Sequence, residues 1–356
     1  DFNMEKKELD LGVQYLRGAA ALFVVFFHLR HLISSVIPGI NLGDLLFGEG
    51  SAGVDIFFVI SGYIIALSTN DKLRSTSRSF IIKRFFRLYP PFIICLLLFV
   101  IVLGLQGRTY SSVDIMRSAF MLHSNYSTDA PYFGYNILYP AWTLTYEVYF
   151  YIVFCVALSV SHTHRIFIAS SILIISVAAV QLCYNGSISF RASGEMVYGD
   201  GLLNIVASPM LFEFVAGMWL FSIRNKLPKG PSWRYVYILI AIISFFGITS
   251  AVNAGHGIDG YGFWAICIVY CVVFIERCAP LPKIQYLYLL GEISYSLYLS
   301  HVVVINIILD KASSYGYGGI SLMLILVSLC IITSIVMFNL IEKKSIWIGK
   351  NFIERS

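Results

Sequence analysis

The sequence predicts an all-α integral membrane protein that crosses the bilayer about ten times. Of its 356 residues, 58% are hydrophobic and only 13% are charged, whereas about 25% of the residues of a typical soluble domain are charged. The mean hydropathy is +0.77, and apolar runs recur along the whole length. These observations exclude a pair of soluble domains and favour a single transmembrane domain over residues 1–356.

Each predicted span is close to the about 20 residues that a helix needs to cross the hydrocarbon core. The first spans are separated by a basic loop at 70–88 and by a long loop at 107–138, which is rich in tyrosine and small polar residues. The ten spans are roughly 12–34, 51–69, 89–106, 139–160, 166–184, 201–222, 233–252, 260–276, 289–309 and 319–341. Pro90 and Pro91 are expected to mark the start of the third span or a kink in it.

Lysine and arginine determine the predicted orientation, because cytoplasmic loops carry an excess of both. With both termini in the cytoplasm, nineteen of the 25 fall on the inner side and five on the outer side, while Arg17 lies at the inner end of the first helix. This asymmetry explains the net charge of +5 without a nucleic-acid partner, and membrane lipids are the expected surroundings. Residues 1–3 are interpreted as a remnant before a native start at Met4, and no fused soluble domain is expected.

Arg17 and His28 are eleven residues apart on the first predicted helix. At about 100° and 1.5 Å per residue, they share one face and lie roughly 16 Å apart along the axis. An ionisable group inside a membrane helix is costly and faces a cavity or a partner, so this pair is a functional candidate.

Three further spans place ionisable groups at a similar depth, in the outer half of the membrane. These groups are Asp55, Glu147 and His301. A carboxylate that orients an imidazole could let His28 act as a general base on a hydroxyl group. Two structural alternatives stay open, because His301 could bond a neighbouring helix and Asp55 could cap its own.

Arg84 and Arg87 lie on one helix face at the cytoplasmic end of the third span. Two guanidinium groups in this arrangement can bind a phosphate bidentately. Contact with anionic lipid headgroups is the alternative. The residues therefore suggest a phosphorylated donor at the inner face and a proton-transfer site near the outer face.

Aromatic residues are concentrated near the predicted outer entrance, where they could stack on a sugar ring or form an interfacial aromatic belt. They are Tyr126, Tyr132, Phe133, Tyr135, Tyr139 and Trp142. The seven cysteines are expected to be small apolar core residues, and no metal site is expected.

Six stretches, in order, resemble the bacterial membrane-bound acyltransferase-3 family, which includes O-acetyltransferases of O-antigens and other surface glycans. They are Leu16-Arg17-Gly18 followed by His28, the block 53–63 (GVDIFFVISGY), Arg84-x-x-Arg87-Leu88-Tyr89-Pro90, Trp142-Thr143-Leu144-x-x-Glu147, Phe212-Glu213-Phe214-x-x-Gly217-Met218, and Ser294-Tyr295-Ser296-Leu297-Tyr298-Leu299-x-His301. The resemblance implies ten helices in the bacterial inner membrane. It also implies transfer of an acyl group, commonly acetyl, from cytoplasmic acyl-CoA to a sugar hydroxyl outside.

By this resemblance His28 is the catalytic histidine and Arg17 its partner, with Glu147 or Asp55 orienting the imidazole. Acyl-CoA, a substrate rather than a bound cofactor, would be held by Arg17, Lys83, Arg84 and Arg87. Supporting roles are expected for Ser61, Glu213, Tyr295 and His301, and glycan contacts for Tyr132, Tyr135, Tyr139 and Trp142.

Two questions stay open from the sequence. His28 could act as a base, or it could carry the acyl group covalently. A different class of protein, a proton-coupled multi-pass exporter of a small anion or a glycan precursor, would also place ionisable groups inside a helical bundle.

Overall fold

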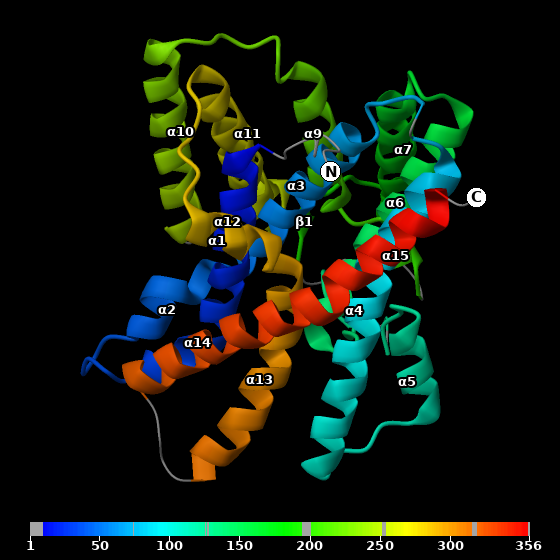
Figure 1. The fold of residues 1–356 in the computed structure, drawn as a ribbon. Helices are drawn as coiled ribbons and strands as arrows, with labels where there is room; N and C mark the ends of the chain where they lie inside the picture. The colour runs from blue at the N-terminus through cyan, green and yellow to red at the C-terminus, as the bar shows by residue number, and fades with distance from the viewer. Residues whose placement is uncertain are drawn as a thin grey trace.

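The computed structural model describes residues 10–73, 75–124, 126, 128–193, 201–250, 254–314 and 319–354. Helices make up almost all of the described secondary structure (Figure 1), and the one described sheet pairs two strands of two residues. The all-α class predicted from the sequence is therefore confirmed.

The described helices are connected by turns, several of them short 3-10 or π segments. In chain order the helices and strands are α1 (Leu11–Leu29), α2 (Leu42–Phe47), α3 (Gly53–Ser68), α4 (Ser77–Leu105), α5 (Ser112–Ala119), α6 (Trp142–Val160), α7 (Arg165–Asn185), β1 (Arg191–Ala192), α8 (Leu203–Val206), α9 (Leu211–Ile223), α10 (Pro231–Thr249), β2 (His256–Gly257), α11 (Phe263–Cys278), α12 (Gln285–Glu292), α13 (Ser294–Ser314), α14 (Ile320–Met337) and α15 (Lys343–Glu354).

Eight helical stretches among the described residues are long and apolar enough to cross a membrane, and a ninth is added if α12 and α13, bent by 70°, form one span. The chain is thus a multi-pass membrane protein. The predicted span 201–222 is not one helix, because it divides into α8 and the 13-residue α9. Pro209 lies between the two and has no N–H to continue the helical hydrogen-bond ladder.

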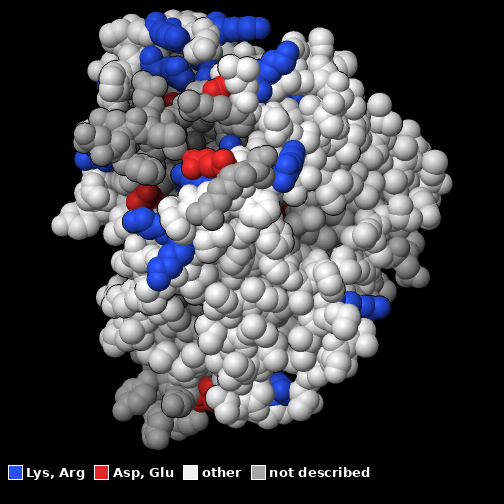
Figure 2. Space-filling model, turned by 45° about the vertical axis from the view of Figure 1, so that its right-hand side comes forward, with Lys and Arg blue, Asp and Glu red and all other residues white. Residues whose placement is uncertain are grey.

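The surface charges are distributed unevenly along the molecule. Figure 2 shows most of the lysines and arginines in view over the upper part of the molecule, whereas the lower part has few charged residues. An uncharged region of this kind suits contact with lipid. The cytoplasmic location of both termini stays a prediction.

Helix α4 differs from the predicted third span because it begins twelve residues earlier, at Ser77, and runs through both prolines without a break. A reciprocal capping box between Thr76 and Ser79 fixes its start. Pro90 cannot donate to the carbonyl of Phe86, and the hydroxyl of Ser345 in α15 donates to that carbonyl instead, at 2.6 Å. One rigid helix therefore carries Arg84 and Arg87 into the bundle.

Glycine allows α3 and α9 to pack backbone against backbone. A Cβ atom on Gly217 would lie 1.9 Å from the carbonyl oxygen of Val59, and one on Gly62 would lie 2.2 Å from that of Phe214. Only glycine fits at such distances. This contact brings Glu213, on α9, against α3 at the level of Asp55.

Candidate functional site

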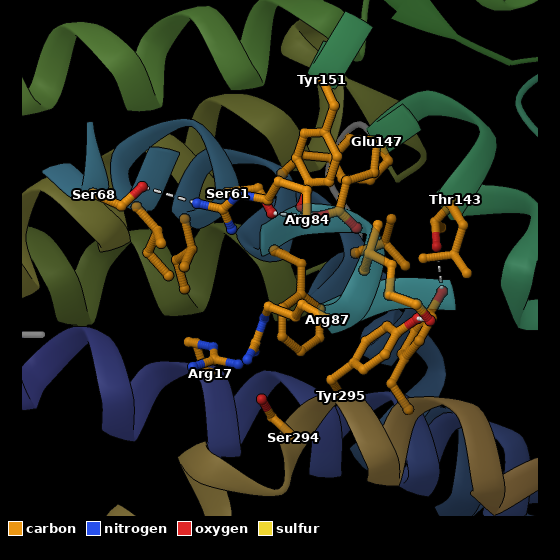
Figure 3. Close-up of a pocket in the computed structure, with 18 of the residues that line it drawn as sticks. Arg17, Ser61, Ser68, Arg84, Arg87, Thr143, Glu147, Tyr151, Ser294 and Tyr295 are labelled. Atoms are coloured by element: carbon orange, nitrogen blue, oxygen red, sulfur yellow. Dashed lines mark hydrogen bonds between the residues drawn. The ribbon is translucent and has the colours of Figure 1, made fainter. Parts of the chain in front are cut away.

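A cavity of about 460 Å³ lies inside the bundle between α1, α3, α4, α6 and α13. This volume is within the range of small-molecule sites. Figure 3 shows its polar residues pointing inward from several helices. The cavity is lined by Arg17, Val54, Phe57, Phe58, Ile60, Ser61, Ile64, Leu67, Ser68, Arg84, Arg87, Leu88, Thr143, Leu144, Glu147, Tyr151, Ser294, Tyr295 and Tyr298.

Three arginines from two helices far apart in the sequence meet at one end of this cavity. Arg17 comes from α1, and Arg84 and Arg87 come from α4 (Figure 3). Arg84 Nη2 donates to the Ser68 hydroxyl at 2.9 Å, and Arg17 Nη1 donates to Gln14 at 3.1 Å. The positive charges of the three guanidinium groups add up at this end of the cavity, so this end attracts anions.

A buried glutamate that the sequence analysis did not identify lies beside these arginines. Glu342, at the end of the last predicted span, is fully buried. Its Oε1 is 3.4 Å from Arg87 Nη1, and its Oε2 accepts from the Ser296 hydroxyl at 2.6 Å. A glutamate buried in an apolar span is a signal that would have found it, because such a group needs a cationic partner.

Glu147 lies in the same cavity and has different partners from the one predicted. Its Oε1 accepts from the Tyr151 hydroxyl and from the Ser61 hydroxyl at 3.3 Å. The expectation that Glu147 orients His28 is therefore corrected, because the carboxylate lies on the cavity wall among residues of α3 and α6.

Tyr298 and Thr143 close the opposite end of the cavity. Their hydroxyls are 3.0 Å apart, and Tyr298 also donates to the carbonyl of Pro140 at 2.8 Å. Behind Tyr298, at 6.2 Å between ring centroids, lies the fully buried imidazole of His301.

His28 is packed against His301, with their ring centroids 5.2 Å apart. The ring of Tyr139 lies 5.4 Å from His28 on another side. His301 Nδ1 faces the carbonyl of Leu297 at 3.1 Å, and its Nε2 is buried without a hydrogen-bond partner among the described residues. His28 does not itself line the cavity, so Tyr298 and His301 separate it from the arginines.

Asp55 also has a different partner from the predicted His28. Its Oδ2 is 2.7 Å from Nδ1 of His256, and its Oδ1 accepts from the backbone N–H of Gly257 at 3.2 Å. The Glu213 carboxyl lies against Asp55 rather than in the cavity. His256 was not among the predicted site residues, because a histidine between two glycines in a two-residue strand shows no helical periodicity.

The aromatic residues of the 120–142 region form a connected group near this dyad. Tyr132 stacks on Tyr135 with centroids 4.8 Å apart and packs edge-on against Trp142 at 5.1 Å. Burial and the nearby Asp55 carboxylate raise the pKa of Tyr132, so its hydroxyl stays protonated at neutral pH. Phe133 is in the core instead, with 1% exposure.

Two other predicted site residues, Lys83 and Tyr295, take different positions relative to the cavity. Lys83 is exposed on α4 and does not line the cavity. Tyr295 lines the cavity and donates to the carbonyl of Leu88 at 2.8 Å. Within the described ranges, no group of three or more His, Cys, Asp or Glu side chains is arranged to hold a metal ion.

Comparison with protein families gives a match to the acyltransferase-3 domain over residues 10–341. One similar protein is the exopolysaccharide production protein ExoZ of Rhizobium meliloti, 25% identical over 77% of this chain and 82% of the relative. Another is a Komagataeibacter xylinus protein, BcsY, provisionally named a membrane-bound transacylase, 27% identical over 87% of this chain and 76% of the relative.

Staphylococcus aureus strain COL has a further relative, provisionally named an O-acetyltransferase. It is 28% identical over 83% of this chain. The chain spans about half the length of this staphylococcal protein, since the match covers 51% of it. No solved structure matches the chain.

Proposed function

Because the chain belongs to the acyltransferase-3 family and is a multi-pass membrane acyltransferase, we propose that it transfers an acetyl group from acyl-CoA to a hydroxyl of a bacterial surface glycan. The donor would enter the cavity from the cytoplasm, and the acceptor would approach from the outer side of the inner membrane. O-antigen and exopolysaccharide are the acceptor classes that the resemblance and the relative ExoZ suggest.

The observation that supports an acyl-CoA donor best is the convergence of Arg17, Arg84 and Arg87 at one end of the cavity. CoA combines several phosphate charges with a long flexible arm. Guanidinium groups bind phosphate through charge-assisted hydrogen bonds. Beyond the arginines, the walls become apolar and aromatic, with Val54, Phe57 and Leu144 among the lining residues, which suits an uncharged pantetheine arm.

The far end of the cavity supports His28 as the catalytic residue. We propose that the thioester reaches Tyr298 and that movement of this side chain admits it to the His28–His301 pair. An imidazole can receive the acyl group or deprotonate the acceptor hydroxyl. In direct transfer the ester bond forms as the thioester C–S bond breaks, and the CoA thiol leaves with the hydroxyl proton. In the covalent route the C–S bond breaks as the acyl group bonds the imidazole nitrogen, and the ester then forms as that C–N bond breaks and the hydroxyl proton passes to the imidazole.

The experiment uses purified protein in lipid nanodiscs, acetyl-CoA, and surface polysaccharide that mild alkali has freed of its esters. We expect release of the CoA thiol and new O-acetyl groups on the polysaccharide, measured with a thiol reagent and by mass spectrometry. Absence of both products from folded wild-type protein would contradict the proposal. Uptake of a small anion or a glycan precursor into vesicles that contain the protein, without release of the CoA thiol, would favour the exporter instead.

A further inference from the structure

The pair formed by His256 and Asp55 is a second buried imidazole centre, separate from His28. His256 lies in strand β2, which pairs with β1 so that Ala192 lies opposite His256. The His256 side chain is 4% exposed and that of Asp55 is fully buried. When Nδ1 donates its proton to this carboxylate, the neutral imidazole keeps a lone pair at Nε2.

Nε2 of His256 is buried and has no hydrogen-bond partner among the described residues. A buried polar atom without a partner costs about 1–3 kcal/mol, so this atom is a candidate for contact with a ligand. A structural histidine in the same protein looks different. Both ring nitrogens of buried His123 have partners, at 3.1 Å to Phe133 O and 3.0 Å to the Thr145 hydroxyl.

Aromatic rings surround the imidazole of His256. The ring centroids of Tyr261, Trp142 and Tyr132 lie 5.6, 5.7 and 6.0 Å from it. Tyr132 stacks on Tyr135, which is 39% exposed. A row of rings thus leads from the surface to the imidazole, and aromatic faces of this kind pack against the C–H face of a sugar.

The dyad also adjoins the far end of the acyl-donor cavity. Val54 and Thr143 line that cavity, and they directly neighbour Asp55 and Trp142 in the chain. Helices α3 and α6 therefore each have one residue that lines the cavity, Val54 or Thr143, and a directly adjacent residue at the dyad, Asp55 or Trp142. A group bound at His256 would lie beside the region that the acyl chain enters.

We propose that His256 Nε2 binds a hydroxyl of the saccharide acceptor as its hydrogen-bond acceptor. Asp55 is a positioning residue that holds the imidazole in the Nδ1–H form, while Tyr132 and Tyr135 stack on the sugar. This proposal rests on the proposed function and adds the site of the acceptor to it. His256 is assigned to acceptor binding and His28 to the acyl group.

The test measures acceptor binding without turnover. The probes are the alkali-treated polysaccharide, whose hydroxyls are free, and the same polysaccharide after chemical O-acetylation. Wild-type protein should prefer the free form by about tenfold, the size of one hydrogen bond to a desolvated partner. His256→Gln should lose most of this preference and keep its affinity for acetyl-CoA. His164→Gln, at an exposed position, is the matched control and should behave as wild type.

Turnover provides a second readout. His256→Gln should raise the KM for the polysaccharide about tenfold. Asp55→Asn should also raise the KM for the polysaccharide. If either variant fails to fold, Tyr135→Ala, at the exposed end of the row of rings, provides the test. It should weaken binding of the free polysaccharide and leave the affinity for acetyl-CoA unchanged.

Equal preference for the free form in wild type and His256→Gln would overturn the proposal, as would an unchanged KM in the variant or unchanged polysaccharide binding by Tyr135→Ala. Failure of the proposed function gives a different result. Wild-type protein would then release no thiol and transfer no acetyl group, whatever its preference between the two polysaccharides.

Discussion

The two ends of the cavity use polar groups in opposite ways. At the arginine end, each cation has a protein partner: Ser68 for Arg84, Glu342 for Arg87 and Gln14 for Arg17. Beyond the other end, one nitrogen of His301 and one of His256 are buried without a partner among the described residues. The arginine end, the proposed anion site, is thus stable when empty, whereas the proposed reacting end keeps hydrogen-bonding capacity for a substrate.

The strongest test of this difference is removal of the imidazole at the reacting end. His28→Ala should lower acetyl transfer by about 100- to 10,000-fold, the usual contribution of a general base. Affinity for acetyl-CoA should change little, because the proposed phosphate site is at the arginines. Transfer is measured with radiolabelled acetyl-CoA, and binding by calorimetry. Retained transfer would contradict a catalytic role for His28. A loss of acetyl-CoA binding as large as the loss of transfer would contradict the binding of the donor phosphates at the arginine end.

The arginine end is tested by Arg84→Ala combined with Arg87→Ala. Loss of two charge-assisted hydrogen bonds, about 1.5–3 kcal/mol each, should weaken acetyl-CoA binding by roughly 100-fold or more. Arg78→Ala, at an exposed position on the same helix, is the control and should bind normally. An unchanged affinity in the double variant would assign these arginines to lipid headgroups.

Glu342 tests whether a carboxylate of the protein itself competes with the phosphates of acetyl-CoA for Arg87. Glu342→Gln removes a carboxylate that faces Arg87, so repulsion of the bound phosphates falls and acetyl-CoA should bind roughly three- to tenfold more tightly. The empty protein should unfold at a lower temperature, because the arginines repel one another without it. Calorimetry and thermal unfolding with and without acetyl-CoA measure both effects. Weaker acetyl-CoA binding by the variant would mean that Glu342 shapes the site rather than competing for it.

Tyr298 tests the boundary between the two ends, with the smallest expected effect. Tyr298→Phe keeps the ring but loses the hydroxyl bonded to Thr143 and Pro140, which costs about 1 kcal/mol. Acetyl transfer should change severalfold, and donor affinity should not. Tyr149→Phe is the matched control, because this α6 tyrosine does not line the cavity and its hydroxyl bonds Ser176 of α7. A loss of transfer as large as that of His28→Ala would make the hydroxyl part of the chemistry.

Helical spans could be predicted from the sequence because each must bury about 20 apolar residues in lipid. The breaks were harder to predict. Pro209 interrupts an apolar run that a hydropathy pattern treats as continuous, whereas Pro90 does not interrupt α4, because Ser345, far away in the chain, bonds the freed carbonyl. Such compensation depends on tertiary packing and leaves no local signal.

The candidate site shows the same limit. Arg17 and Glu147 were identified because charged residues in apolar spans need partners, and Arg84 and Arg87 because two guanidinium groups on one helix face can bind a phosphate. The structure brings all four into one cavity. Which partner each takes was not predictable. Asp55 bonds a histidine 201 residues away in the sequence, and that histidine lies in a two-residue strand, which is too short for periodicity to carry information.

The most direct test of the account is a structure of the protein in nanodiscs with an acetyl-CoA analogue whose thioester sulfur is replaced by a methylene group. We expect the phosphates to lie within hydrogen-bond distance of Arg84 and Arg87. The acetyl carbonyl should lie beside Tyr298, on the side of His301. Phosphates bound outside the cavity, or an acetyl group that points away from the imidazoles, would contradict it.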